Sequence, residues 1–208
     1  MPNGLACRPS QVRPRRIRMG PPPNHNPNRR RTGGFTIVEA ALATVIVSTG
    51  VLAILGAQQA YHRKNNWAQR SGTGMLLANE LRELTLTLPM HDPITATQNM
   101  GAEADEIEVG DYDDLDDFAG PVTNGFGAGI VFSPPINASR QPIDDLDGWT
   151  QRIDVYNVLP GNISVSDGLT QPLGTTDMMR AKVTVTYQGP LDGQPVTMTV
   201  LTWVVGRE

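Results

Sequence analysis

Acidic side chains are the residues of this chain whose type and spacing could do chemistry. Five aspartates fall in one short tract, at Asp111, Asp113, Asp114, Asp116 and Asp117. Their carboxylate oxygens would suit Ca²⁺, which prefers about six to eight oxygen ligands. The tract lacks the D-x-[DN]-x-[DN]-G spacing and the distal glutamate of an EF-hand loop. Two interpretations therefore stay open, a calcium site and a solvated acidic loop.

Glu39 is a second acidic residue of interest, because it stands inside an apolar stretch. It is the only charged residue of 35–57, which reads FTIVEAALATVIVSTGVLAILGA. A carboxylate at mid-membrane costs about 2.5 to 3.5 kcal/mol on insertion scales, so such a group usually has a partner. The alternative is a carboxylate that reaches water, because Glu39 lies only one turn inside the stretch.

Residue combinations typical of enzymes are missing from the sequence. His25, His62 and His91 stand in three different contexts, and Cys7 is the only cysteine. No G-x-S-x-G, H-E-x-x-H, P-loop or dinucleotide motif occurs. We therefore expect no enzyme, no catalytic residue and no cofactor, apart from the calcium considered above.

The apolar stretch predicts a single membrane-spanning helix. At about 1.5 Å per residue, a helix over 35–57 would reach roughly 34 Å, which exceeds the hydrocarbon core of about 30 Å. The preceding Arg29, Arg30 and Arg31 favour a cytoplasmic N-terminal flank, although Arg63 and Lys64 on the far side weaken this bias. The C-terminal part should then lie outside the cytoplasm.

The helical pattern continues beyond this span. Leucines repeat on one helix face, at Leu77, Leu81, Leu84 and Leu88, and Pro89 follows. We expect one helix over 35–88, with a bend or local melting at Gly72 and Gly74, because each glycine costs about 1 kcal/mol relative to alanine.

The C-terminal part carries strand patterns. We expect an acidic, loop-rich region over 89–128 and an antiparallel β-sheet domain over 129–208, so the fold class is α+β. Candidate strands are 129–132, 152–158 and, more weakly, 163–165. Alternation over 181–187 and the β-rich segment 196–205 predict a hairpin, whose turn contains Asp192-Gly193.

Charge divides the chain at Gly34. Residues 1–34 hold eight arginines, no acid and few apolar side chains, which predicts a disordered basic leader. The remainder holds 21 acidic residues against nine lysines and arginines, a formal charge of −12. Phosphate backbones would repel this part, so no nucleic-acid partner is expected.

The residues Gly33-Gly34-Phe35-Thr36-Ile37-Val38-Glu39 resemble the processing site of type IV prepilins and type II secretion pseudopilins. The resemblance implies cleavage after Gly34 and N-methylation of Phe35 by a prepilin peptidase. It also implies that Glu39 serves assembly, by pairing with the Phe35 ammonium of a neighbouring subunit. The implied partners are other pilin or pseudopilin subunits and an assembly platform in the inner membrane.

The same resemblance implies a pilin-like fold, in which a long N-terminal helix packs on a C-terminal sheet. Many major pilins close a C-terminal loop with a disulfide, and a chain cut at Gly34 would hold no cysteine, which favours a minor pilin or pseudopilin. The acidic tract and the C-terminal hairpin more loosely resemble the minor pilins called mannose-sensitive haemagglutinin biogenesis protein D. The alternatives are a low-copy binding module at a filament tip and, less favoured, a single-pass membrane enzyme.

Overall fold

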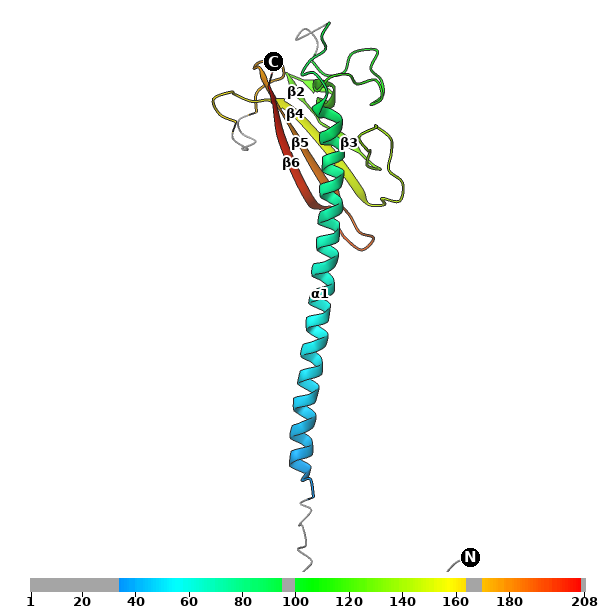
Figure 1. Ribbon diagram of the computed structural model, residues 1–208, viewed down its shortest axis with the longest axis vertical. Coiled ribbons are helices and arrows are strands. Elements are labelled where there is room, and N and C mark those ends of the chain that lie inside the picture. The colour runs from blue at the N-terminus through cyan, green and yellow to red at the C-terminus, as the bar shows by residue number, and fades with distance from the viewer. Residues whose placement is uncertain (1–33, 95–99, 164–169, 207–208) are drawn as a thin grey trace, which may run out of the picture. The chain divides into compact units, whose positions relative to one another are not determined.

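The computed structural model describes residues 34–94, 100–163 and 170–206 (Figure 1). Its contacts divide the chain into two compact units, which meet between Gly50 and Val51. One helix, α1 (Ile37–Leu86), contributes residues to both units. The expected basic leader, apart from Gly34, lies outside the described residues.

Helix α1 has two differently composed parts. Residues 37–69 are all exposed, although many of them are large and apolar. An 18-residue window of α1 is strongly apolar, yet none of its residues is buried by the described chain. By length and composition, α1 is therefore able to cross a membrane. Its buried residues begin only near the end, at Gly74, Leu77, Ala78, Leu81, Leu84 and Thr85.

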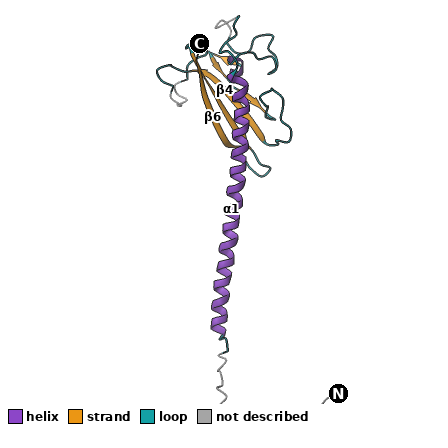
Figure 2. Cartoon of the chain, in the orientation of Figure 1, coloured by secondary structure: helices purple, strands orange, loops and turns teal. Residues whose placement is uncertain are grey.

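A four-stranded antiparallel sheet follows α1 in the chain (Figure 2). Its strands are β3 (Ile130–Phe132), β4 (Trp149–Asn157), β5 (Met178–Tyr187) and β6 (Val196–Gly206), in the spatial order β3-β4-β5-β6. The α+β class is confirmed, and so is the hairpin, in which β5 and β6 pair from Tyr187↔Val196 to Met178↔Gly206. Ile163 belongs to no strand, and the rest of the weak candidate 163–165 lies outside the described residues.

The core forms where the leucine stripe of α1 meets one face of this sheet. Alternation along β4 and β5 turns Ile153, Val155, Val183 and Val185 inward, and each is at most 2% exposed. These residues share one hydrophobic cluster with Leu81. A helix stripe of period 3.6 and a strand face of period 2 thus bury their apolar sides against each other.

Gln151 is a polar residue inside this core, and its side chain links the helix to the sheet. Its Nε2 donates to the carbonyl of Leu77 at 2.8 Å and to that of Ile136 at 3.1 Å. Its Oε1 accepts from the Ile136 N–H at 2.7 Å. A buried amide is tolerated when its donors and acceptor are satisfied, as they are here.

The prediction of local melting at the two glycines is wrong, because α1 runs unbroken through Gly72 and Gly74. Gly74 is buried against β6, where an added Cβ would lie 2.9 Å from Met198 Cβ and 3.2 Å from Thr199 Oγ1. Gly72 has nothing within 4 Å of such an atom. Gly74 therefore allows the helix to approach the sheet closely, a role that helix propensity alone does not reveal.

The region expected to be loop-rich also contains three short elements. They are the 3₁₀ helix η2 (Asp116–Ala119) and the paired strands β1 (Val122–Thr123) and β2 (Phe126–Gly127). The turn between β1 and β2 is Asn124-Gly125, with φ of 53° and 81°. This residue pair is a strong hairpin signal, so the small hairpin was available in the sequence and was missed.

The two glycines of α1 offer a matched pair of substitutions. We expect Gly74→Leu to lower the free energy of unfolding by about 1 to 3 kcal/mol, because the new side chain overpacks against β6. Gly72→Leu should instead raise it, by up to about 1 kcal/mol, because leucine is the better helix former. Thermal unfolding of the full chain in detergent measures both. Equal effects at the two positions would contradict the close packing at Gly74.

Candidate functional site

The residues of the expected cleavage site precede α1 in exposed, irregular backbone. Gly34, Phe35 and Thr36 have no regular secondary structure, and the Phe35 side chain is 77% exposed. Apart from its chain neighbours, no atom of the described residues lies within 4 Å of a Cβ built on Gly34. Within the described residues, the peptide bond between Gly34 and Phe35 is thus open to a protease that needs an unencumbered chain.

Glu39 closes a capping box with Thr36 at the start of α1. The Thr36 N–H and hydroxyl each donate to Glu39 Oε2 at 3.0 Å. In return, the Glu39 N–H donates to Thr36 Oγ1 at 3.2 Å. This T-x-x-E arrangement satisfies N–H groups that the first turn of a helix leaves unpaired. Glu39 therefore has a partner within its own chain, which the spacing of Thr36 and Glu39 could have indicated.

Only part of the acidic tract is exposed to solvent. Asp111 and Asp113 are exposed, but Asp114, Asp116 and Asp117 are at most 2% exposed. The apolar neighbours Leu115 and Phe118 are fully buried and draw the tract into the core. The interpretation as a solvated loop is thus wrong for the three buried aspartates, because burying the apolar residues between them carries the carboxylates inward.

Two of the five aspartates, Asp111 and Asp116, contact residues outside the tract. Asp111 Oδ2 accepts from the Glu108 N–H at 3.1 Å. Asp116 Oδ1 lies 2.9 Å from His91 Nδ1, and its Oδ2 accepts from the Gly101 N–H at 2.8 Å. The pair with His91 links the tract to the chain just after α1, so the role of Asp116 is structural.

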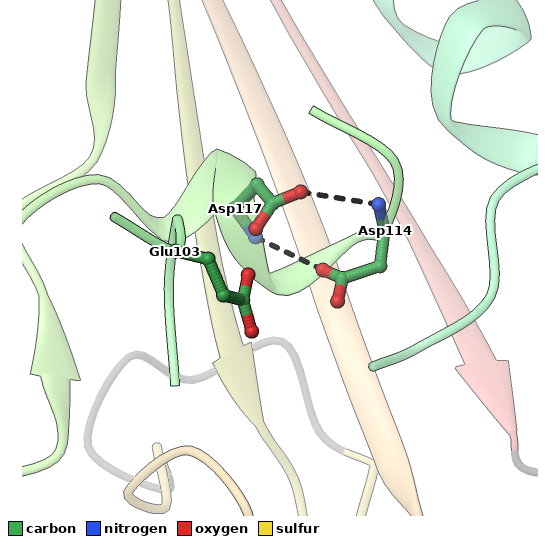
Figure 3. A group of neighbouring side chains, drawn as sticks. All are labelled: Glu103, Asp114 and Asp117. Carbon is green, nitrogen blue, oxygen red and sulfur yellow. Dashed lines mark hydrogen bonds between the residues drawn. The ribbon is translucent and has the colours of Figure 1, made fainter. Parts of the chain in front are cut away.

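Asp114 and Asp117 bind each other's backbone at the start of η2 (Figure 3). Asp114 Oδ1 accepts from the N–H groups of Asp116 and Asp117, at 2.8 and 3.2 Å. Asp117 Oδ2 accepts from the N–H groups of Asp113 and Asp114, at 3.0 and 3.1 Å. One oxygen of each carboxylate is thereby held in place by two backbone N–H groups.

Among the described residues, the buried Asp117 Oδ1 has no hydrogen-bond partner. The neighbouring Glu106 carboxyl could share a hydrogen bond with Asp117 only when one of the two groups is protonated. Around Asp117 lie two groups of carboxylates that share it, one with Glu103 and Asp114 and one with Glu106 and Asp113. We call these five residues the acidic cluster. In each group the ligand atoms lie within 4.8 Å of one another. Oxygens bound to one Ca²⁺ at about 2.3 to 2.6 Å can be at most about 5 Å apart, so either group fits this ion.

The acidic cluster differs from the tract that the sequence suggested. Asp113, Asp114 and Asp117 belong to it, whereas Asp111 and Asp116 lie outside both groups. Glu103 and Glu106 were not expected. They precede the tract in the chain, and only the fold brings their carboxylates to Asp117, so no local pattern could have identified them.

The charge of the acidic cluster raises its proton affinity. Burial, together with the negative charge of Asp116, raises the pKa of Asp114 to about 9. Burial also raises the pKa of Asp117 and that of Glu106 above their ordinary values. The neighbouring Tyr112 has a raised pKa for the same reason, with Asp117 adding to the shift. A proton or a cation would relieve this repulsion.

No protein-family model, curated protein or solved structure matches this chain. The functional argument therefore depends on the residues and contacts described above.

The raised pKa values predict a pH-dependent stability in calcium-free buffer. Between about pH 4 and pH 9 the folded state holds a proton on Asp114 that the unfolded state has released, so stability falls as the pH rises through this window. We expect Asp117→Asn to flatten this dependence and to raise the free energy of unfolding at pH 8 by about 1 to 3 kcal/mol, because its amide removes a charge and can donate to the neighbouring carboxylates. Thermal unfolding of the full chain between pH 5 and pH 8 measures both effects. Stability that rises with pH over this range would contradict the assignment.

Proposed function

We propose that this chain is the precursor of a minor pilin or pseudopilin, a structural subunit of a type IV pilus or a type II secretion-like filament, and not an enzyme. It would lie in the inner membrane as a single-pass protein, with its C-terminal domain outside the cytoplasm. A prepilin peptidase would cut after Gly34 and methylate Phe35, and an assembly platform would then move the subunit into the filament.

The observation that carries this proposal is the position of the processing motif relative to α1. Gly34 and Phe35 stand in exposed, irregular chain, and α1 begins two residues later with Glu39 in its first turn. The helix then presents apolar residues that no part of the described chain covers. A cleavage site directly before an uncovered apolar helix suits a subunit that moves from a bilayer into a bundle of like helices.

The polar side chains in the first half of α1 are compatible with such a setting. Thr44 Oγ1 donates to the Ala40 carbonyl at 2.8 Å, and Ser48 Oγ donates to the Thr44 carbonyl at 2.7 Å. Thr49 Oγ1 donates in the same way to Val45, at 3.0 Å. These hydroxyl groups need no water, because the backbone of α1 satisfies them. The helix can therefore contact lipid or other helices along this length.

Glu39 would have two partners in succession. Within one chain it caps α1 through Thr36. After cleavage, the α-ammonium of Phe35 on a neighbouring subunit offers a stronger partner, because a hydrogen bond between charged groups exceeds one to a neutral donor. The capping box would thus hold the carboxylate until the subunits meet.

Mass spectrometry of the mature N terminus tests the processing step. In a cell with a prepilin peptidase, we expect the chain to begin with N-methylated Phe35 and Gly34→Leu to block the cut, because a large side chain obstructs the approach of the protease. A mature protein that still begins upstream of Gly34 would overturn the proposed function.

A pair of variants then separates capping from assembly. Glu39→Ala should be processed but incorporated into filaments at least about tenfold less, since a charge-assisted contact is worth roughly 1.5 to 3 kcal/mol. Thr36→Val also removes the capping box but leaves the Glu39 carboxylate, so it should be incorporated far better than Glu39→Ala. If both variants are incorporated equally, Glu39 serves only as a helix cap.

We also propose that the acidic cluster binds Ca²⁺. Asp117 Oδ1, buried and unpartnered within the described residues, favours this second function, because Asp117 shares two groups of carboxylates whose spacing suits the ion. Bound Ca²⁺ would join the segment that carries Glu103 and Glu106 to the start of η2. Its role would be structural, as a link that stabilises the loop-rich part of the domain.

Isothermal titration calorimetry of the full chain in detergent tests this proposal. We expect Ca²⁺ to bind in or below the millimolar range that is typical of extracellular sites, roughly 10⁻⁴ to 10⁻³ M, and to release protons as it binds. Asp117→Asn should abolish the binding. Asp111→Asn is the matched control and should bind as the unchanged chain does, because Asp111 lies outside both ligand groups. No binding up to several millimolar, or an equal loss in both variants, would exclude the site.

A further inference from the structure

The turn between β5 and β6 carries an almost fully exposed leucine on a hydrogen-bonded backbone. Leu191 is 98% exposed. The Gly189 N–H donates to Asp192 Oδ2 at 2.9 Å, and the Asp192 N–H donates to the Gly189 carbonyl at 3.0 Å. The Gln188 N–H donates to the Gly148 carbonyl at 2.8 Å, which ties the base of the turn to the start of β4. A hydrogen-bonded turn thus presents an apolar side chain to its surroundings.

This turn lies at the end of the sheet that faces the earlier residues of α1. The Arg70 guanidinium lies 4.4 Å from the ring centre of Tyr187, the last residue of β5. Farther along α1, Gly74 meets Met198 and the Leu77 carbonyl meets Gln151. Going back along α1 from Leu77 to Arg70 therefore leads toward the turn. The residues of α1 just before Arg70 lie on the same side of the domain as Leu191.

The stretch of α1 on this side has the composition of a membrane interface. Tyr61 and Trp67 are 69% and 53% exposed, and Arg63 and Lys64 between them are also exposed. No acidic residue occurs from 40 to 79. Tyrosine and tryptophan collect where a bilayer meets water, and lysine and arginine pair with lipid phosphates there. The apolar stretch ends at Ala57, only one turn before Tyr61.

We propose that the 188–195 turn and residues 61–67 of α1 form one surface, the lipid-facing end of the domain, which rests on the headgroup layer of a phospholipid bilayer. This inference depends on the proposed membrane span of α1. Leu191 inserts among the lipid headgroups, and Arg63 and Lys64 bind lipid phosphates. Contact at two places, the helix and the turn, would hold the domain in one orientation before the subunit leaves the membrane.

Charge complementarity favours zwitterionic phospholipids as the lipids that contact this surface. Their phosphates match Arg63 and Lys64, as the phosphates of anionic lipids also would. The connection before β4 carries the exposed aspartates Asp144, Asp145 and Asp147 at this end of the sheet, however, and a strongly anionic surface would repel them. Asp192 is held in the turn by its bond to Gly189.

Three glycines offer matched positions for a fluorescent reporter. Gly193 lies in the turn, Gly161 follows the opposite end of β4, and Gly56 lies in the apolar stretch, and none has an atom within 4 Å of an added Cβ. Cys7 is the only native cysteine, so in a Cys7→Ser background each Gly→Cys variant has a single thiol. The full chain, labelled with an environment-sensitive dye, is reconstituted in phosphatidylcholine nanodiscs that contain a nitroxide-labelled lipid headgroup.

We expect the label at position 193 to be quenched at least about twofold more than the label at 161, because the turn reaches the headgroups. Leu191→Asp should reduce the quenching at 193 to the level at 161. Arg63→Glu combined with Lys64→Glu should reduce it as well. The label at 56 should be shielded from water in all of these variants.

The reporters separate failure of this inference from failure of the proposed function. A shielded label at 56 with equal quenching at 193 and 161 would overturn the lipid-facing turn and leave the membrane span intact. A label at 56 that is open to water would overturn the span, and the inference would be lost with it. Quenching at 193 that survives Leu191→Asp would exclude Leu191 as the contact.

Discussion

The structure depends on one constraint, which is that the two parts of a single helix, α1, need different surroundings. The end of α1 buries Leu77, Leu81 and Leu84 against the sheet, so the protein itself covers that stripe. Residues 37–69 have no such cover in the described chain, although 37–57 are strongly apolar. Exposing so much apolar surface to water is unfavourable, at roughly 25 cal/mol for each Å². Lipid or other helices would remove this cost by covering the surface, and the proposed membrane span and the proposed filament each supply such a cover.

Polar groups at both ends of α1 are satisfied in ways that suit these surroundings. At its start, Thr36 and Glu39 satisfy each other within one turn. At the packed end, Gln151 reaches from β4 to the Leu77 carbonyl, and Gly74 removes the side chain that would hold β6 away. The helix–sheet contact thus combines apolar burial with one satisfied amide and one close backbone approach.

The acidic cluster presents the opposite problem, because it brings five carboxylates together at a partly buried place. Two of its aspartates are fixed by backbone N–H groups, yet Asp117 Oδ1 is left without a partner. Burial and the neighbouring negative charges both raise the pKa values of Asp114 and Asp117. A bound cation or proton would relieve this repulsion and would thereby stabilise the loop-rich part of the domain.

The sequence by itself determined the features that depend on neighbouring residues. The apolar stretch, the isolated Glu39, the leucine stripe from Leu77 and the alternation that forms the β5–β6 hairpin are all local patterns, because helix and strand periods act over a few residues. Only the tertiary structure decided which carboxylates converge on Asp117, why Gly74 lies in a helix interior, and which end of the sheet presents Leu191. Each of these depends on the packing of segments far apart in the chain, and no local pattern records that packing.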